Sequence, residues 1–346
     1  MEELEIRGLR PGEESRMDAL LAREGLQRDA WLDYSAGIFD KGELVATGSC
    51  AGNTLRCLAV DHRRQGEGLL NMLVRHLIQF QYQRGNYHLF LYTKGSAAPL
   101  FEDLGFHEIA RDGQRAVFLE NRRQGFSDYL QSLLRETPAA PAAPQGAIVM
   151  NANPFTLGHQ YLAEQAAAAC STLHLFVVSE DLSVFPAEDR MALVRSGTAH
   201  LSNVVYHRTD SYLISRATFP SYFLADGDQA ACAQARLDGA VFTRIAAALG
   251  ITVRFLGTEP TSHVTALYNQ ALSQVLPPAG VECRILPRRE LDGAPISASV
   301  VRQALKDGDW ALAERLVPPS TADYFHSEKG QRVAARLRAT EQVNHH

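Results

Sequence analysis

The spacing of apolar residues divides this sequence into short runs and longer periodic segments. Runs such as TLRCLAV (54–60), GAIVM (146–150) and LHLFVVS (173–179) have the length expected of buried strands. Segments such as 187–201, in which apolar residues recur at helical spacing, predict amphipathic helices. Because the two kinds of segment alternate along most of the chain, the pattern predicts an α/β fold.

A segment rich in proline and alanine, residues 137–145, interrupts this alternation. It offers no apolar face to bury, which predicts a linker. Residues 1–136 predict a compact α/β domain, and residues 146–326 predict a Rossmann-like parallel sheet with right-handed crossovers. The charge-rich remainder, residues 327–346, is expected to be a solvated helix or a disordered tail.

The amino-acid composition of the chain limits the kinds of binding partner that we expect. The 346 residues are 46% hydrophobic and 21% charged with a formal net charge of -5, which suits a globular protein with a large core. No segment is strongly basic, so we expect neither nucleic acid nor an anionic membrane as the main partner. The sequence shows no secretory signal and no apolar stretch of about 20 residues, so we expect a cytoplasmic protein.

The five cysteines lie far apart in the sequence and form neither a CxxC pair nor a cluster with histidine. We therefore expect buried free thiols in a reducing compartment, and no metal site made by the protein's own side chains. They are Cys50, Cys57, Cys170, Cys232 and Cys283.

The first candidate site lies in GAIVMNANPFTLGHQYL, where a buried strand ends and a helix begins. The N-terminus of a helix carries free N–H groups and a partial positive charge, which suits a phosphate. Gly158 allows a ligand to approach closely, and Thr156 and His159 can converge on one phosphoryl group. In isolation, the same residues favour a capping threonine, a turn glycine and a surface histidine.

A second helix begins at hydroxyl groups near the end of the chain, in ISASVVR. Ser297 and Ser299 can contact phosphate oxygens beside free N–H groups, and Arg302 can reach back along the first turn. Alone, this segment favours a capped helix with a surface arginine. Together with TLGH, it indicates a phosphate site.

The pair of motifs resembles the two-part signature of the nucleotidyltransferase superfamily, (H/T)xGH followed by ISxSxxR. Members of this superfamily attack the α-phosphate of a nucleoside triphosphate and release pyrophosphate. The resemblance implies that His159 stabilises charge on the α-phosphate, with Thr156 in place of the first histidine. It also implies that Ser297, Ser299 and Arg302 hold the β- and γ-phosphates.

Two further segments join the site by the same resemblance. The polar, turn-prone loop before TLGH, with Asn153, Pro154 and Phe155, is implied to contact the nucleotide. RFLGTEP ends a predicted strand at Gly257, and Glu259 follows in a stretch that approaches the nucleotide in the superfamily. A role for Glu259 in capping the loop is an equal alternative.

Several other polar residues have open interpretations. Arg190 resembles a helix arginine of this fold, and a solvated helix charge explains it as well. Ser215, Arg216 and Thr218 either line an anion-sized substrate pocket or belong to a loop beside core aromatic residues. His174 lies within an apolar strand and is expected to be structural.

The first domain carries Arg63-x-x-Gly66-x-Gly68 between a strand and a helix, a loop whose N–H groups can cradle a pyrophosphate. With its flanking segments, the loop resembles the GCN5-related N-acetyltransferase fold, in which it binds the pyrophosphate of coenzyme A. No residue of the domain stands out as an acetyltransferase base. CoA-like binding and a structural or docking role therefore both stay open.

Over nearly its full length the sequence resembles the citrate lyase ligase family, with the segments above in the same order. The resemblance implies an AMP-forming ligase that uses ATP to convert acetate to acetyl-adenylate. It would then acetylate the thiol of the prosthetic group on the acyl-carrier subunit of citrate lyase. Mg²⁺ is expected to arrive with ATP.

Two other functions are compatible with the motifs. A cofactor-making adenylyltransferase, acting on phosphopantetheine or nicotinamide mononucleotide, would share both motifs and release no free AMP. A protein whose first domain uses acetyl-CoA, and whose second domain only binds nucleotide, would not depend on His159.

Overall fold

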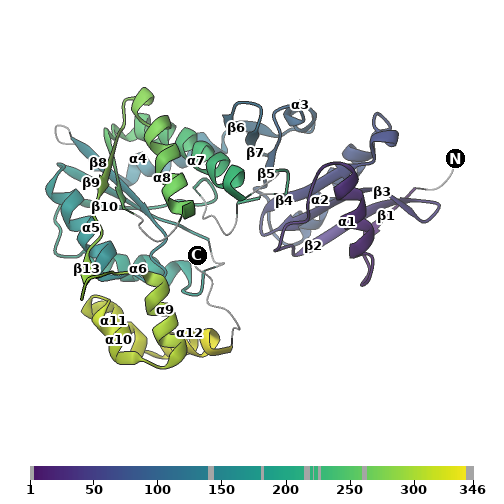
Figure 1. The fold of residues 1–346 in the computed structure, drawn as a ribbon. Coiled ribbons are helices and arrows are strands. Elements are labelled where there is room, and N and C mark those ends of the chain that lie inside the picture. Colours follow the sequence, from purple (N-terminus) through teal and green to yellow (C-terminus); the bar gives the residue numbers. More distant parts are fainter. Residues whose placement is uncertain are drawn as a thin grey trace. The chain divides into compact units, whose positions relative to one another are not determined.

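The computed structural model describes residues 4–138, 144–180, 183–213, 219–220, 222–224, 227–258 and 263–339. These residues form two compact units, drawn as ribbons in Figure 1. The first unit contains the residues up to Ser127 and those from Pro220 to Leu237. The second contains the residues from Asp128 to Phe219 and from Asp238 onward. No helix within the described residues is both long enough and apolar enough to cross a membrane.

The first unit is built on a seven-stranded mixed sheet. Adjacent strands run antiparallel except β4 and β5, which are parallel. In spatial order the strands are β1 (Glu5–Gly8), β2 (Tyr34–Asp40), β3 (Glu43–Ala51), β4 (Thr54–Val60), β5 (Phe90–Thr93), β7 (Ala116–Glu120) and β6 (His107–Asp112).

Two helices, α1 (Glu14–Arg23) and α2 (Leu69–Gln83), pack against this sheet. Helix α2 buries Leu69, Leu73 and Leu77, whose spacing of four residues places them on one face. The unit also contains the short helices η1 (His62–Arg64) and α3 (Ala98–Glu102). Together, helices and sheet bury one apolar core.

The second unit is built on a five-stranded sheet in which every strand is parallel to its neighbours. In spatial order the strands are β10 (Val204–Arg208), β9 (Thr172–Val177), β8 (Gln145–Met150), β11 (Val253–Gly257) and β12 (Glu282–Leu286). The order reverses between β8 and β11, and ligands of such sheets bind at the carboxyl ends of the strands at this point. The predicted α/β fold class is confirmed, as is the parallel sheet predicted for the second domain.

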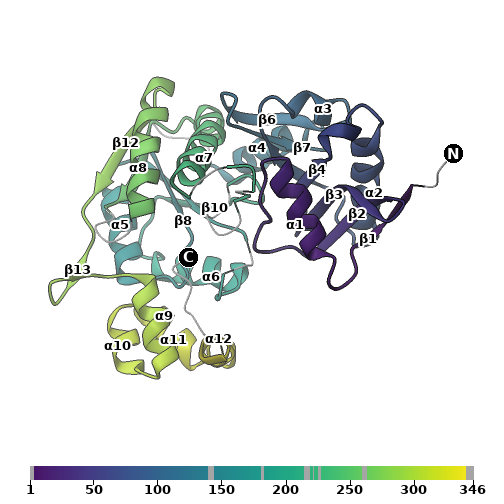
Figure 2. The same ribbon diagram turned by 45° about the vertical axis from the view of Figure 1, so that its right-hand side comes forward.

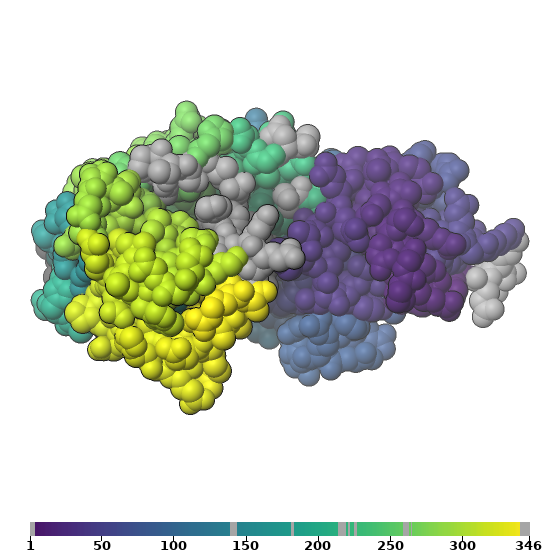
Figure 3. All heavy atoms as spheres, turned by 60° about the horizontal axis from the view of Figure 1, so that its bottom comes forward, coloured from purple at the N-terminus to yellow at the C-terminus, as the bar shows by residue number. Residues whose placement is uncertain are grey.

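Helices surround the parallel sheet, and α7 and α8 lie side by side in both ribbon views (Figures 1 and 2). The helices α9 to α12 gather into one continuous surface near the end of the chain (Figure 3). The helices and the small hairpin from residue 125 onward are α4 (Gly125–Glu136), α5 (Leu157–Ala168), α6 (Ala187–Gly197), α7 (Gly227–Leu249), α8 (His263–Val275), η2 (Pro277–Ala279), β13 (Glu290–Leu291), β14 (Ala294–Pro295), α9 (Ala298–Asp307), α10 (Trp310–Arg315), α11 (Pro319–His326) and α12 (Glu328–Ala339).

The packing divides the chain differently from the predicted domains. Helix α4 lies before the predicted boundary at residue 136, yet the Tyr129 hydroxyl donates to the Arg208 carbonyl oxygen of β10 (2.9 Å). Conversely, Tyr222 lies within the predicted second domain, but its hydroxyl donates to the Tyr92 carbonyl oxygen of β5 (2.7 Å). Gln145, predicted to end the linker, begins β8. Residues 139–143 of that linker are outside the described residues.

The expectation of a solvated helix or a disordered tail after residue 327 is wrong for α12. This helix buries Val333, Ala334 and Leu337 in the core of the second unit. Lys329 also forms an ion pair with Asp189 of α6 (2.7 Å). The apolar stripe is narrow among many charges, which explains why composition alone suggested a solvated segment.

Candidate nucleotide-binding site

The TLGH segment forms the first turn of α5, directly after the loop that leaves β8. Thr156 is the N-cap residue, and its side-chain oxygen accepts a hydrogen bond from the His159 backbone N–H (3.4 Å). The Thr156 backbone N–H in turn donates to His159 Nδ1 (3.1 Å). Because Nδ1 accepts a hydrogen bond, the ring proton of the neutral imidazole is on Nε2. His159 is therefore held as a donor through Nε2–H.

The charge state of His159 follows from its surroundings. Burial, together with the positive charges of Arg288 and Arg302, lowers its pKa to about 4. At neutral pH the ring is therefore uncharged, and its Nε2–H can donate a hydrogen bond to an anion.

The loop between β8 and α5 is tightly held. Asn153 and Phe155 are buried, and the Asn153 side-chain oxygen accepts a hydrogen bond from the Phe185 N–H (3.1 Å). The peptide bond between Asn153 and Pro154 is cis. The Phe155 ring stacks on the His159 ring, with centroids 5.8 Å apart. The predicted loop residues thus support the imidazole.

The two motifs meet in space. A Cβ atom added to Gly158 would lie 3.2 Å from the carbonyl oxygen of Ile296, the residue before ISAS's first serine. Arg302 Nη1 donates to the Asn153 carbonyl oxygen (2.6 Å), and the Leu157 N–H donates to the Leu316 carbonyl oxygen (3.0 Å). The beginnings of α5 and α9 therefore belong to one site.

The serines of the second motif lie at the start of α9. Ser297 is the N-cap residue and accepts a hydrogen bond from the Ser299 N–H (3.3 Å). The two hydroxyl oxygens are 2.7 Å apart. Arg302, in contrast, is only 2% exposed, and burial lowers its pKa to about 10. Its Nη1 donates to the Asn153 carbonyl oxygen in the loop of the first motif, so the side chain joins the two motifs through the protein interior.

Gly257 lies at the carboxyl end of β11, on the other side of the point where the strand order reverses. The Asn269 side-chain amide donates to its carbonyl oxygen (3.0 Å). The following Thr258 N–H donates to the Leu286 carbonyl oxygen at the end of β12 (2.8 Å). Glu259 is outside the described residues, so its predicted role stays a prediction.

The sequence interpretation missed one cation near these motifs, Arg288. It stands two residues after the end of β12, and its backbone N–H donates to Thr258 Oγ1 (3.1 Å). Its position within PRRE, directly after a parallel strand, was the available signal.

Comparison with known proteins identifies the family. Residues 145–325 match the citrate lyase ligase C-terminal domain. The [citrate [pro-3S]-lyase] ligase of Klebsiella pneumoniae is 41% identical over 314 residues, which cover 89% of this chain and 91% of the relative. The chain belongs to the citrate lyase ligase family. The corresponding ligase of Escherichia coli (strain K12) is 42% identical, covering 82% of each chain, and that of Haemophilus influenzae is 38% identical, covering 90% of this chain and 94% of the relative.

Solved structures of acetyltransferases resemble a smaller, N-terminal part of this citrate lyase ligase family member. The ribosomal-protein-S18-alanine N-acetyltransferase from Escherichia coli covers 34% of this chain and 92% of its own, with 21% identity and a TM-score of 0.28. An acetyltransferase of the GNAT family from Staphylococcus aureus covers 35% and 100%, with 13% identity and a TM-score of 0.31.

The surroundings of Arg190 in α6 decide against one of the two interpretations of its sequence, the solvated helix charge. The side chain is fully buried and donates to the carbonyl oxygens of Asn151 (2.9 Å) and Val178 (2.6 Å). It also donates to the carbonyl oxygens of Phe185 and Glu180. Arg190 therefore fastens the loops that leave β8 and β9, and a solvated charge is wrong. Ser215, Arg216 and Thr218 are outside the described residues.

His174 is buried in β9 and belongs to a chain of hydrogen bonds. Its ring nitrogens lie 2.9 Å from the Gln145 side-chain oxygen and 3.0 Å from His207 Nε2. His207 Nδ1 lies 2.8 Å from a carboxylate oxygen of Glu136 in α4. The contacts join β8, β9, β10 and α4 to one another, in keeping with a structural role.

The five cysteines are free thiols, but only Cys50 and Cys57 are fully buried. Burial raises the pKa of each of these two thiols to about 12. Cys170, Cys232 and Cys283 are half-buried, so the prediction that all five are buried is wrong. The last three lie at or near the ends of helices and in β12, where their elements are partly open to solvent.

The glycine loop of the first unit has the predicted backbone. Gly66 and Gly68 have φ values of +87° and +78°, which favour glycine, and Gly68 precedes the first turn of α2. Arg63, however, pairs with Asp61 (2.7 Å), and Arg64 pairs with Asp40 (2.6 Å). The arginine charges of this loop therefore face carboxylates of the same unit.

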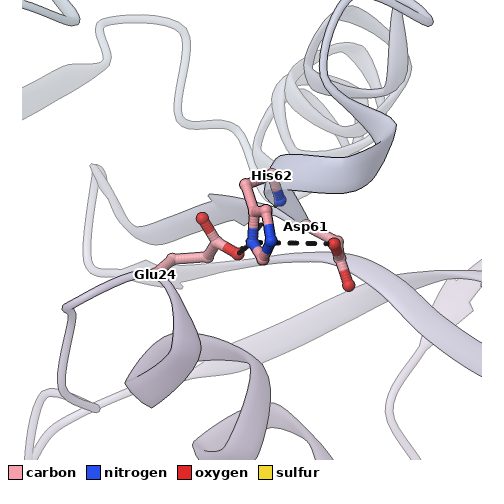
Figure 4. A group of neighbouring side chains, drawn as sticks. All are labelled: Glu24, Asp61 and His62. Atoms are coloured by element: carbon pink, nitrogen blue, oxygen red, sulfur yellow. Dashed lines mark hydrogen bonds and ion pairs between the residues drawn. The ribbon is translucent and has the colours of Figure 1, made fainter.

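Figure 4 shows Glu24, Asp61 and His62 beside this loop, with ligand-type atoms within 4.8 Å of one another. Glu24 accepts a hydrogen bond from the His62 N–H (3.0 Å) and lies equally close to His62 Nδ1. Asp61 accepts from the Arg63 N–H and from its guanidinium. Protein donors already satisfy these carboxylates, so we assign no metal ion to the group.

Proposed function

We propose that this protein is a [citrate [pro-3S]-lyase] ligase that activates acetate with ATP and acetylates the acyl-carrier subunit of citrate lyase. The observation that carries the proposal is the 41% identity with the Klebsiella pneumoniae ligase across 89% of this chain. The meeting of TLGH and ISAS at the reversal of strand order supports it, because this is where a nucleotide would bind.

In the first step, a carboxylate oxygen of acetate attacks the α-phosphorus of ATP. The bond from this phosphorus to the bridging oxygen of the β-phosphate breaks, which gives acetyl-adenylate and pyrophosphate. Negative charge spreads over the α-phosphate oxygens as the new bond forms. We assign the Nε2–H of His159 to these oxygens, since Thr156 fixes the ring with Nδ1 as an acceptor.

The remaining phosphates require donors and countercharge. The N-terminus of α9, with the hydroxyls of Ser297 and Ser299, would hold the β- and γ-phosphates. Gly158 fits this arrangement because a side chain at this position would press against the Ile296 carbonyl oxygen and push the starts of α5 and α9 apart. Mg²⁺ would arrive on the triphosphate and neutralise part of its charge.

In the second step, the sulfur of the carrier's prosthetic group attacks the acetyl carbonyl carbon. The bond between this carbon and the adenylate oxygen breaks, the thiol proton passes to solvent, and AMP leaves. The product is an acetyl thioester on the carrier subunit. The residues assigned above would supply positioning and electrostatics for the first step, and we assign no residue to the second.

The experiment that tests the proposal combines MgATP, acetate and the thiol form of the carrier subunit. We expect the intact mass of the carrier to rise by one acetyl group, in step with the release of AMP. If the carrier stays unmodified while phosphopantetheine or nicotinamide mononucleotide becomes adenylylated, the function is instead that of a cofactor-making adenylyltransferase. Omission of acetate is the control for transfer that does not pass through acetyl-adenylate.

A further inference from the structure

The loops that follow β11 and β12 are fastened to each other at the carboxyl edge of the parallel sheet. The Thr258 N–H donates to the Leu286 carbonyl oxygen (2.8 Å), and the Arg288 N–H donates to Thr258 Oγ1 (3.1 Å). Both strands run parallel, so both loops emerge on the side where TLGH begins α5. The backbone of Arg288 is thus fixed beside the candidate nucleotide site.

The side chain of Arg288 extends over Gly257. Its Cγ atom lies 4.0 Å from the position that a Cβ atom would take on Gly257. After burial, the positive charges of Arg288 and Arg302 contribute to the lowered pKa of His159. Arg288 therefore follows β12, and His159 begins α5, at the same carboxyl edge of the parallel sheet.

Arg302, the arginine of the second motif, has a different environment. Arg302 is 2% exposed and donates to the Asn153 carbonyl oxygen inside the protein. Arg288 is half-exposed and stands on a loop. A triphosphate carries about four negative charges, and a guanidinium binds phosphate oxygens with two parallel hydrogen bonds. The geometry thus gives the two arginines different tasks.

We propose that Arg288 binds the pyrophosphate portion of ATP and stabilises it as it leaves, whereas Arg302 positions the loop of the first motif. This inference rests on the proposed function, because it assigns a residue to the ATP of that reaction. In the adenylation step, Arg288 contacts the β- and γ-phosphate oxygens, which gain charge as the bond to the α-phosphorus breaks. It transfers no proton.

The test compares Arg288→Gln and Arg288→Lys with Arg289→Gln, an adjacent arginine whose side chain is exposed. Acetate-dependent exchange of labelled pyrophosphate into ATP measures the first step without the carrier subunit. We expect Arg288→Gln to lower kcat/KM for ATP by about 10- to 100-fold, the usual range for losing a hydrogen-bonded charge. The KM for acetate should change less than about twofold, and Arg288→Lys should recover part of the loss.

Calorimetry with inorganic pyrophosphate and with ATP tests the role of Arg288 separately from the proposed ligase function. If the wild type binds both ligands and Arg288→Gln weakens both by about 10-fold or more, Arg288 has the assigned role even if no acetyl group reaches the carrier. If Arg288→Gln binds and exchanges pyrophosphate like the wild type, or if Arg289→Gln loses as much, the inference is wrong. A wild type that binds neither ligand overturns the nucleotide site and the inference together. Equal thermal unfolding temperatures of the three variants and the wild type exclude a loss of folding as the cause.

Discussion

Both units of this protein place a glycine-containing loop between a strand and a helix, and the sequence predicts phosphate binding for both. In the second unit, the loop ends in Thr156 and His159, which form reciprocal hydrogen bonds at the start of α5. In the first unit, Gly68 precedes α2 without a side-chain cap, and Arg63 pairs with Asp61. A loop motif therefore predicts the backbone, but only the packed structure shows which charges face an incoming anion.

The largest expected effect is on the histidine of the second loop. His159→Ala should lower the rate of carrier acetylation by about 10²- to 10³-fold, because it removes a donor aimed at the developing charge. His159 is partly buried, and its contacts with Thr156 and Phe155 lie within the loop before α5 and its first turn, so the unfolding temperature should change little. His200→Ala, at an exposed position three residues after the end of α6, is the matched control and should keep the wild-type rate. A folded His159→Ala enzyme with full activity would contradict the assignment of His159 to the phosphate site, and with it the difference between the two loops.

The next largest expected effect is a loss of stability of the second unit at acid pH. Burial lowers the pKa of His174, which also lies against His207, and of His207 itself, to about 4. In the unfolded chain these rings titrate near ~6.5, so their stabilising effect is complete above that pH and is lost as the pH falls toward 4. At pH 5 the loss is about 2 kcal/mol for one such ring, and the two rings are coupled.

The two tryptophans allow this loss to be located. Trp31 lies in the first unit and Trp310 in the second, and the chain has no others. Urea unfolding followed by fluorescence of a Trp31→Phe variant should show a marked drop in the stability of the second unit between pH 7.5 and pH 5. The same drop in a Trp310→Phe variant, which reports on the first unit, would contradict its assignment to the buried histidines of the second unit, His174, His207 and His159.

Glycine-to-alanine substitutions should affect the KM for ATP in the loop of the second unit and stability in the loop of the first unit. Gly158→Ala brings a methyl group to 3.2 Å from the Ile296 carbonyl oxygen, which must shift the two motifs apart by a few tenths of an ångström. We expect the KM for ATP to rise by about 10-fold, because phosphate donors depend on sub-ångström placement. Gly68→Ala forces a positive φ on alanine and should cost the first unit ~1 kcal/mol of unfolding free energy.

Carrier acetylation by Gly68→Ala at a temperature where the variant is folded should match the wild type. Equal changes in the ATP KM for both variants would show that the two loops share one ligand or that the shift is transmitted between them. Urea unfolding of Gly68→Ala, followed by Trp31 fluorescence in a Trp310→Phe background, supplies the stability value.

The smallest expected effect is that of Arg63→Ala. Asp61 neutralises this guanidinium, and the pair raises the pKa of Arg63 and lowers that of Asp61. Removing it from a solvent-exposed loop should change the rate of carrier acetylation by less than about twofold. A fall of 10-fold or more, measured as KM for the carrier subunit, would mean that Arg63 leaves Asp61 to bind an anion on the carrier.

Much of the second unit could be predicted because its signals are local. Apolar runs define its strands, and both motifs lie at strand or helix ends where the chain order alone places them. The role of Arg302 could not be predicted in this way. Its partner, the Asn153 carbonyl oxygen, is 149 positions away in the sequence, and a backbone oxygen leaves no side-chain signature.

The limits of the units also depend on tertiary contacts. Helix α4 precedes the Pro/Ala segment, which the sequence predicts to be the domain boundary. The hydrogen bond from Tyr129 nevertheless attaches α4 to β10. Burial of Val333 and Leu337 likewise depends on helices packed elsewhere in the unit. Arg288 was missed because its neighbourhood, PRRE, looks like an ordinary charged loop until β11 and β12 are aligned.

The contact between Arg302 and Asn153 also has a consequence for the synthesis of the protein. A ribosome completes TLGH long before it reaches the arginine that holds the preceding loop, and Leu316, which accepts the first N–H of α5, follows later still. The nascent chain therefore carries the phosphate motif for about half of its translation without the parts that close it. Premature termination anywhere in that interval yields a polypeptide that has the sequence of the site and lacks its geometry.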